Sequence, residues 1–270
     1  MSLMTRIFFA FALLVSLSVP VMASDTLQEA KGKGILVVGV RNMMPPFGFV
    51  DQKHMTYIGY DVDFATAIAN RLGVKLELRT SSKPLIPLLQ NGDIDLIAGA
   101  MTKTAKRQQQ IDFSHGYFLT GQKFLVKKGK IKTLKDLEGQ KIGTGRNSSS
   151  EQNLKNALPG ANILTFPGYR EAFRSLSLGA VVAISTDEPL LAGLLISDAD
   201  KAQYEIPNIS ISEEVYGLGI RKNDKPFLDF VNQTLLEMEK NGEAAKIFDK
   251  WFGPTSASPM ERRFKITAGK

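Results

Sequence analysis

The stretch "IDLIAGAMTKTAKRQQQIDFSHGY", residues 94–117, joins a buried run to an exposed one. Residues 94–98 are apolar around a single carboxylate, which is typical of the end of a buried strand. Small and hydroxyl-bearing residues follow at once, and Arg107 comes after them. Ligands of open α/β sheets bind beyond the carboxyl ends of the strands, so this stretch is a candidate site.

The sequence before this stretch alternates between strand and helix patterns. Residues 34–40 are almost continuously apolar, as in a strand covered on both faces. Residues 61–73 open on Asp61, repeat apolar residues along one face and stop at a glycine, which predicts an amphipathic helix capped at both ends. A strand over 75–80 and a short helix over 84–92 come next. This alternation predicts a mostly parallel sheet.

The same rhythm starts again after the opening stretch. We expect strands over 122–129 and 141–145, and a helix over 148–158 whose Ser148 and Glu151 have capping-box spacing. The remaining predicted elements cover 161–166, 169–179, 180–186, 187–195 and 213–222, followed by a helical tail over 224–253.

Two α/β lobes follow from this restart. Strand-like sequence continues through 118–124 and 214–220, so we expect the chain to cross between the lobes twice, with the C-terminal helices returning to the first lobe. The predicted first lobe comprises residues 24–119 together with 219–270, and the second comprises 120–218. A cleft between two such lobes is the expected ligand site.

The N-terminus predicts export. Residues 1–23 carry one basic residue, then an apolar run, then small residues where a signal peptidase would cut. An anchoring helix is the alternative, but the run is short for a bilayer. The chain has no cysteine, which excludes a lipid anchor at the cleavage site and any disulfide. We therefore expect a soluble mature protein of the Gram-negative periplasm.

Composition argues against other classes of protein. The net charge is +7, but the lysines clustered over 127–135 lack the aromatic or arginine-rich residues of a nucleic-acid surface. The only histidines, His54 and His115, lie far apart in sequence, so we expect no zinc site. No cofactor motif is present.

From about Gly34 to Phe252 the chain resembles the family 3 extracytoplasmic solute-binding proteins, the amino-acid-binding components of ABC importers. The order of the matching stretches is more specific than any one of them. Three short stretches, "IPLLQNGDIDL", "DEPLLAG" and "ERRFKI", look most like the glutamate/aspartate-binding branch. The matching stretches are "VVGVRNMMPPFGFVD", "GYDVDFATAIANRLG", "IPLLQNGDIDLIAGAMTKTAKRQQQIDFS", "GYFLTGQKFLVKKG", "FRSLSLGAVVAISTDEPLLAG", "YGLGIRK" and "FDKWF".

The resemblance assigns roles to residues at the strand ends. It implies that Arg107 pairs with the α-carboxylate of the ligand, which the planar guanidinium suits. It also implies that Ala100 offers its backbone, that Thr102 offers its hydroxyl, and that Asp187 binds the α-ammonium. Capping of the following helix is the alternative role for Asp187.

We expect the second lobe to supply a further anion contact. Ser148 and Ser149 follow the strand over 141–145 and open a helix, where free N–H groups favour a carboxylate. Ser148 could also cap that helix, and the two roles are compatible.

The resemblance makes Arg41 the residue most informative about the ligand. An arginine at this place in the acidic-amino-acid branch contacts the side-chain carboxylate, and the alternative is a surface arginine at a strand end. The charges of Arg41, Arg107 and Asp187 sum to +1, which complements glutamate or aspartate. Ser82 is retained from that branch, whereas two of its ligand-binding residues are replaced. A second arginine corresponds to Leu85, and a histidine corresponds to Tyr169.

These expectations define a function and its rivals. The first is a monomeric periplasmic protein that binds an acidic L-amino acid, closes by a hinge motion and delivers the ligand to the membrane permease of an ABC importer. A binder of a neutral polar amino acid such as glutamine is the alternative. A cyclohexadienyl dehydratase of the same fold would need a general acid, for which Glu188 and Glu151 are the candidates. A separate sensor subunit is the third class.

Overall fold

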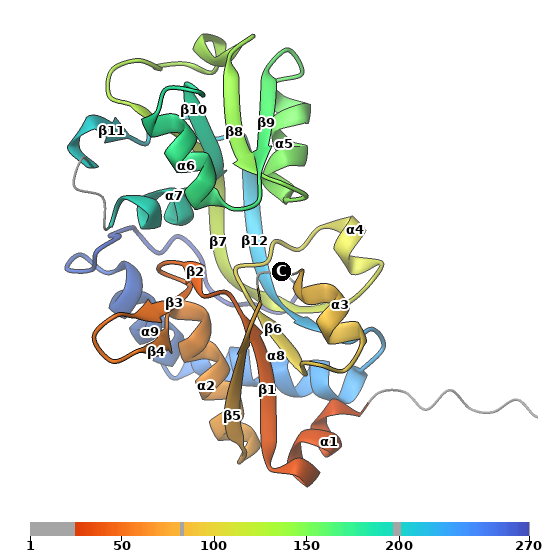
Figure 1. Cartoon of the computed structure of the whole chain (residues 1–270). Coiled ribbons are helices and arrows are strands. Elements are labelled where there is room, and N and C mark those ends of the chain that lie inside the picture. The colour runs from red at the N-terminus through yellow and green to blue at the C-terminus, as the bar shows by residue number, and fades with distance from the viewer. Residues whose placement is uncertain (1–24, 82–83, 197–200, 270) are drawn as a thin grey trace, which may run out of the picture.

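The computed structural model describes residues 25–81, 84–196 and 201–269. The predicted signal peptide, residues 1–23, and the predicted site residue Ser82 lie outside this range. Two α/β lobes lie one above the other, and two long strands run between them (Figure 1). The predicted two-lobed fold is confirmed.

The lower lobe contains the N-terminal and C-terminal parts of the described chain (Figure 1). Its parallel strands pair in the order β5-β1-β6, and helices cover them. A small antiparallel sheet, β2-β3-β4, lies beside them and was not predicted. The elements are α1 (Thr26–Lys33), β1 (Ile35–Val40), β2 (Met43–Met44), β3 (Gly48–Asp51), β4 (Thr56–Ile58), α2 (Tyr60–Leu72), β5 (Lys75–Thr80), α3 (Leu85–Gln90), β6 (Leu96–Ala98), α4 (Ala105–Gln108), α8 (Lys225–Lys240) and α9 (Glu243–Phe252).

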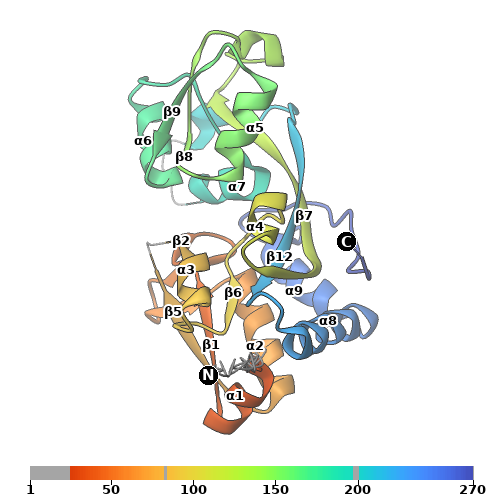
Figure 2. The same ribbon diagram turned by 90° about the vertical axis from the view of Figure 1, so that its right-hand side faces the viewer.

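The upper lobe repeats the arrangement on a smaller scale. Its parallel strands pair in the order β10-β8-β9. Figure 2 shows the same two-part shape from the side. The elements are a 3₁₀ turn η1 (Leu134–Leu137), β8 (Lys141–Gly145), α5 (Ser149–Ala157), β9 (Asn162–Phe166), α6 (Tyr169–Ser177), β10 (Ala183–Asp187), α7 (Glu188–Leu195), a 3₁₀ turn η2 (Lys201–Gln203) and β11 (Tyr204–Glu205).

Two crossing strands join the lobes into one continuous sheet. β7 (Asp112–Lys127) pairs antiparallel with β12 (Ser212–Ile220) in its first part and with β10 in its last part. The sequence predicted a strand over 122–129 and strand-like residues from 118 onward, whereas the strand starts at Asp112. Polar residues in the first part disguised it, and one of them bonds to the partner strand, since the hydroxyl of Ser114 accepts a hydrogen bond from the Leu218 N–H at 2.9 Å.

Aromatic side chains dominate the core of the lower lobe. Phe47, Tyr60, Phe118 and Phe252 are fully buried or nearly so, and their rings contact one another with centroids 4.9 to 5.9 Å apart. Trp251 packs against this cluster, and its indole N–H donates to Asp63. Trp251 therefore has a packing role at the edge of this core. The upper lobe has smaller aliphatic cores on the two faces of its sheet.

The start of α2 differs from its prediction. Gly59 occupies the N-cap position with φ of 144°, and Asp61 lies inside the helix, fully buried. A Cβ at Gly59 would lie 2.0 Å from the carbonyl oxygen of Phe47, so the tight approach of these two segments requires glycine. The prediction that Asp61 caps the helix is wrong, because its carboxylate is used elsewhere. The predicted stop at Gly73 is confirmed.

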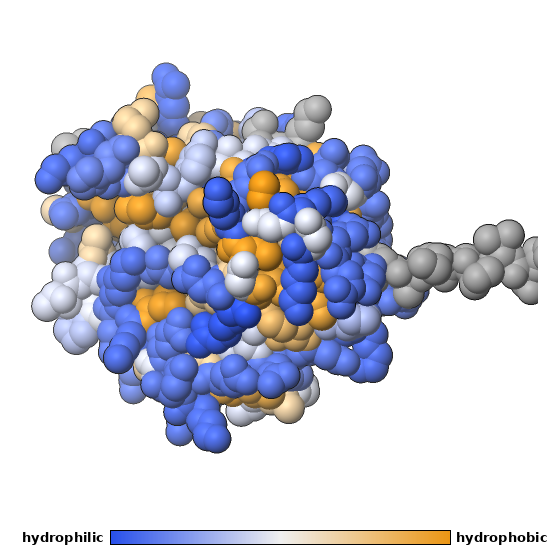
Figure 3. Space-filling view, turned by 90° about the horizontal axis from the view of Figure 1, so that it is seen from below, coloured by the Kyte–Doolittle hydropathy of each residue, from blue (hydrophilic) through white to orange (hydrophobic). Residues whose placement is uncertain are grey.

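The surface of the lower lobe is mostly hydrophilic. From below, hydrophobic residues show as strips between hydrophilic ones (Figure 3). Among the residues that the structure describes, none of the helices has the length and apolar character needed to cross a membrane.

Candidate ligand-binding site

The predicted site residues come from strand ends that meet between the lobes. Arg41 follows β1, Thr102 follows β6, Ser149 opens α5 after β8, and Asp187 ends β10. The hydroxyls of Thr102 and Ser149 approach to 3.3 Å across the boundary. Leu190 of α7 packs into the core cluster of the lower lobe. The two lobes are therefore in contact with each other at the site.

Buried Asp61 shapes the loop after β6. One carboxylate oxygen accepts the Ala100 N–H at 2.8 Å, and the other accepts the Tyr117 hydroxyl at 2.5 Å. Ala100 has φ of 47°, a left-handed conformation that is unusual for alanine. Burial raises the pKa of Asp61 to about 7, although both hydrogen bonds oppose the rise. Asp61 thus fixes the backbone at Ala100, which the sequence predicted to contact the ligand.

Arg107 lies on the short helix α4 and is held by the loop before it. Its backbone N–H is capped by the Thr104 hydroxyl at 3.3 Å, and its Nη1 donates to the Thr102 carbonyl at 2.8 Å. Burial lowers its pKa, while Tyr169 and the carboxylates of Glu214 and Asp187 act in the opposite direction. The guanidinium thus sits close to two carboxylates.

Arg41 belongs to the same buried site. Its Nη1 donates to the Ser81 carbonyl at 3.3 Å. Burial is the main cause that lowers its pKa, and the neighbouring charge of Arg107 lowers it further. Two guanidiniums in one poorly solvated space repel each other, which favours an anionic group between them.

Asp187 faces these arginines from the upper lobe. It occupies the N-cap position of α7, but its side chain makes no capping hydrogen bond. One oxygen accepts the Tyr216 hydroxyl, and Oδ1 has no partner among the described residues, although Asp187 is only 4 % exposed. Burial raises the pKa of Asp187 to about 7, Tyr216 and Arg107 lower it, and Glu214 raises it further. The carboxylate is therefore available to a ligand.

Sequence reasoning missed Glu214. It lies on β12, opposite Thr120 of β7. Glu214 is 3 % exposed, and its Oε1 accepts from Asn153 Nδ2 and from the Ser212 hydroxyl, each at 2.6 Å. Oε2 has no partner in the described part of the chain. The available signal was the period of two along the strand, which places Glu214 on the same face as Tyr216.

The N-terminus of α5 combines a cap with a cleft contact. The Ser148 hydroxyl accepts the Glu151 N–H at 3.1 Å and donates to the Gly145 carbonyl at 2.6 Å. Glu151 Oε2 in turn accepts the Asn147 N–H at 2.8 Å, one residue earlier than a capping box requires. The capping alternative for Ser148 is therefore observed, and Ser149 is the residue that reaches the lower lobe.

This arrangement agrees with a comparison to known sequences. A profile of the bacterial extracellular solute-binding proteins, family 3, matches residues 36–254. The chain belongs to this family.

Two relatives with different named ligands are similar over most of their length. A glutamine-binding protein of Geobacillus stearothermophilus is 37 % identical, over 78 % of this chain and 82 % of that protein. A glutamate/aspartate import solute-binding protein of Salmonella typhimurium is 32 % identical, over 91 % of this chain and 85 % of that protein.

The solved structures include a close match in fold. The crystal structure of the ancestral amino acid-binding protein AncCDT-1, a precursor of cyclohexadienyl dehydratase, matches with a TM-score of 0.77 and 37 % identity. The match covers 84 % of this chain and 99 % of that one.

Leu85 and Tyr169, at which the sequence predicted a departure from the acidic branch, have different surroundings. Leu85 is 1 % exposed and packs in an aliphatic cluster with Ile94 and Ile97, so it supports the strands below the cleft. Tyr169 is partly buried, with its hydroxyl 3.4 Å from the Ser150 hydroxyl, and it also packs against the lower lobe. Phe47 belongs to the core and not to the cleft.

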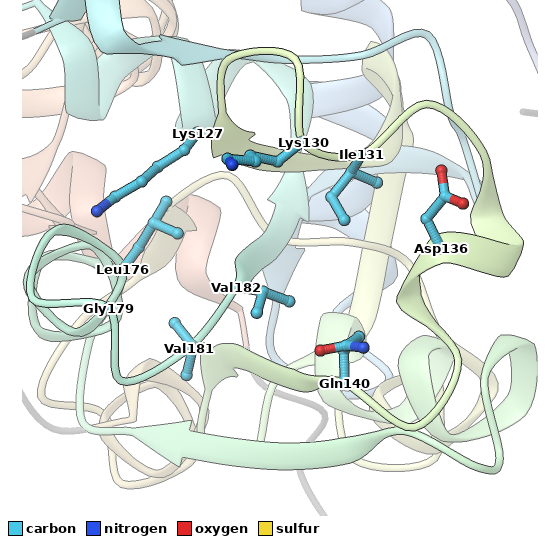
Figure 4. Close-up of a pocket in the computed structure, with 9 residues that line it drawn as sticks. All are labelled: Lys127, Lys130, Ile131, Asp136, Gln140, Leu176, Gly179, Val181 and Val182. Atoms are coloured by element: carbon cyan, nitrogen blue, oxygen red, sulfur yellow. The ribbon is translucent and has the colours of Figure 1, made fainter.

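A second hollow lies away from the cleft in the upper lobe. It has a volume of about 480 Å³, and its apolar floor includes Leu176, Val181 and Val182, with Lys127 and Lys130 at its edge (Figure 4). These lysines are exposed, so the hollow lacks the buried charges of the cleft. Within residues 25–81, 84–196 and 201–269, no three His, Asp or Glu side chains are grouped to hold a metal ion.

Proposed function

We propose that this protein binds a polar L-α-amino acid between its lobes and delivers it to the membrane permease of an ABC importer. The observation that carries the proposal is that Arg107 of one lobe and Asp187 of the other lie close enough across the lobe boundary for the charge of each to shift the pKa of the other. The α-carboxylate and α-ammonium of an amino acid match these two groups. We also propose that residues 1–23 direct export and that the protein acts as a monomer in the periplasm.

Polar groups around the two anchors complete the proposed site. The Ala100 backbone and Thr102 hydroxyl lie beside Arg107, while Ser148 and Ser149 begin a helix whose free N–H groups suit a carboxylate. We place Tyr169 over the ligand, where its hydroxyl accompanies Asp187. Ser82 is proposed from the family pattern alone.

The side chain of the ligand is the open choice. Relatives named for glutamine and for glutamate/aspartate both match the chain, so a ligand of that size is supported. Arg41 beside Arg107 supports an acidic side chain, as its sequence position predicted. A side-chain amide also fits, because its oxygen accepts from a guanidinium.

Closure of the lobes is part of the proposed mechanism. We assign residues 24–119 and 219–270 to one lobe and 120–218 to the other, with β7 and β12 as the hinge. Rotation about two continuous strands moves the lobes as rigid bodies. Closure brings α7 against the segment around Pro45. The approach is tight, because a Cβ on Gly193 would lie 1.9 Å from the Pro45 carbonyl oxygen.

The acids considered for a dehydratase are already engaged. Glu188 forms an ion pair with Lys123 at 2.9 Å. Glu151 pairs with Lys155 at 2.6 Å and accepts the Asn147 N–H. Each of these carboxylates is already paired with a lysine, so neither is free to act on a ligand. This supports a binding protein over an enzyme.

A thermal-shift screen over all the amino acids and small dicarboxylates tests the proposal. Polar amino acids should raise the melting temperature, because a ligand that binds only the folded state stabilises it. Dicarboxylates that lack an ammonium should not. Conversion of prephenate or arogenate, or a response to dicarboxylates alone, would contradict the proposed function.

A further inference from the structure

Two acidic residues, and not one, meet the arginines in the cleft. Glu214 and Asp187 are each more than nine-tenths buried, on adjacent parts of the upper cleft. Each keeps one oxygen without a partner among the described residues, and so does the hydroxyl of Thr120, which lies opposite Glu214 on the sheet. Buried polar atoms are normally satisfied, so three such oxygens together indicate donors supplied by a ligand.

The neighbours of Glu214 fix its position. Asn153 and Ser212 both donate to Oε1, and Asn153 also donates to Gln122 at 2.9 Å. These bonds come from α5, β12 and β7, so they hold one side of the carboxylate and leave Oε2 free. The charge of Glu214 acts to raise the pKa of both Arg107 and Asp187, so its carboxylate lies near both groups.

Glu214 changes the charge balance of the site. The charged groups that we assign to contact with the ligand are Arg41, Arg107, Asp187 and Glu214, and their formal charges sum to zero. The sequence-based count omitted Glu214 and gave +1. A cleft of zero net charge complements an amino acid whose own charges cancel, and an extra carboxylate on the ligand is left unbalanced.

We propose that Glu214 is a specificity-determining residue that makes the cleft select a neutral polar amino acid of glutamine type over glutamate. Its free oxygen accepts a hydrogen bond from an N–H of the ligand, and its charge disfavours a second ligand carboxylate. This inference rests on the proposed function, since it assumes that an amino acid occupies the cleft.

Calorimetric titration of glutamine and glutamate into the wild type and Glu214→Gln tests the inference. The wild type should prefer glutamine by about tenfold or more, and Glu214→Gln should lower the ratio of glutamine to glutamate affinity by about tenfold. Gln keeps the shape and the Oε1 acceptor. Glu214→Asp keeps the charge and should retain the preference, while Glu213→Gln removes an exposed charge one residue away and should leave the ratio unchanged.

A second measurement needs no variant and decides the matter if Glu214→Gln does not fold. Titrations in buffers of different ionisation enthalpy should show that glutamate takes up more protons than glutamine, by up to about one per molecule, because its extra charge must be neutralised. Equal proton uptake together with an equal affinity for both ligands would overturn the inference, as would an unchanged ratio in a folded Glu214→Gln. Absence of binding by the wild type to any amino acid would instead overturn the proposed function.

Discussion

The two halves of the cleft are built differently. On the lower lobe, Arg107 donates to the Thr102 carbonyl, and Asp61 holds the Ala100 backbone. On the upper lobe and the crossing strands, Asp187 and Glu214 each leave an oxygen without a partner among the described residues. The cationic half is held by its own loop, whereas the anionic half is incomplete.

This difference suggests how binding and closure are divided. The guanidinium of Arg107 is already held in place, so it loses little conformational freedom when it binds a carboxylate. The lower lobe can therefore bind the ligand first. The free oxygens of the upper lobe are costly to bury until a ligand donates to them. The ligand ammonium would then stabilise the closed form more than the open one, which is the condition for a ligand to shift that equilibrium.

Removal of Arg107 should have the largest effect on this comparison. Arg107→Ala leaves the α-carboxylate without its partner, and the loss is expected to be about 2–5 kcal/mol, or roughly 30- to 4,000-fold in Kd. Calorimetry should show similar losses for glutamine and glutamate, because both carry the α-carboxylate. The exposed neighbour Lys106 provides the control, Lys106→Ala. Wild-type affinity in Arg107→Ala would remove Arg107 from the site.

The lower half of the site was easier to predict from the sequence than the upper half. Arg107 and Thr102 follow a buried strand directly, so local sequence and the family pattern place them at a strand end. Glu214 acts through the pairing of β12 with β7 and through the approach of the lobes, and neither can be derived from local periodicity. Asp61 was misassigned for a similar reason, since its position fits a helix cap and its real partner, Ala100, lies 39 residues away.

The burial of a strand and its length decide whether the strand is visible in the sequence, and they also explain which strands were missed or predicted too short. Parallel strands such as β1 and β8 are buried on both faces and are visible as apolar runs. The first part of β7 is polar because it lies at the cleft and hinge, so the strand was predicted too short. The small sheet β2-β3-β4 has strands of two to four residues, which are too short for a periodicity signal.

Interference with closure should have the next largest effect. In Gly193→Ala, the new methyl group would meet the Pro45 carbonyl oxygen at 1.9 Å and keep the two halves apart. We expect a loss of about 1–3 kcal/mol, or roughly 5- to 150-fold in Kd, for every ligand. Calorimetry gives the affinity, and scattering should show a larger radius of gyration for the liganded variant.

The control for Gly193→Ala is Gly160→Ala, because a Cβ at Gly160 has no atom within 4 Å among its surroundings. Alanine forms helices better than glycine, so Gly193→Ala should not weaken α7 itself. Equal affinities of wild type and Gly193→Ala would show that ligand binding does not require this contact.

Arg41→Met tests whether the cationic half also contacts the side chain of the ligand. For glutamine the lost hydrogen bond should weaken binding by about 0.5–1.5 kcal/mol, or roughly 2- to 13-fold. For glutamate the lost partner is charged, so the affinity should fall by a larger factor, about 10- to 150-fold. Titration of both ligands into both proteins measures the two factors. Equal factors would mean that Arg41 does not contact the side chain.

A pH dependence of the stability should also distinguish the two halves. The pKa of Asp61 and that of Asp187 are both raised to about 7 by burial, from an ordinary value of 3.8. Between pH 4 and 7 the folded state therefore keeps protons that the unfolded state has lost. Stability contributed by these groups is highest at low pH and decreases as pH rises through this window, by up to about 1.4 kcal/mol per pH unit for each group.

Urea unfolding of ligand-free wild type and Asp187→Asn at pH 5, 6, 7 and 8 measures the contribution of Asp187, since other carboxylates affect both proteins alike. The wild type should lose more stability than the variant between pH 5 and 7. A saturating amino-acid ligand should reduce this difference, because its ammonium lowers the pKa of Asp187. Both carboxylate oxygens of Asp61 are already hydrogen-bonded within the protein, so its share should persist with ligand bound. If the ligand leaves the difference in stability between wild type and Asp187→Asn unchanged, the ammonium does not lie at Asp187. The anionic half of the cleft would then not depend on the ligand to complete its hydrogen bonds.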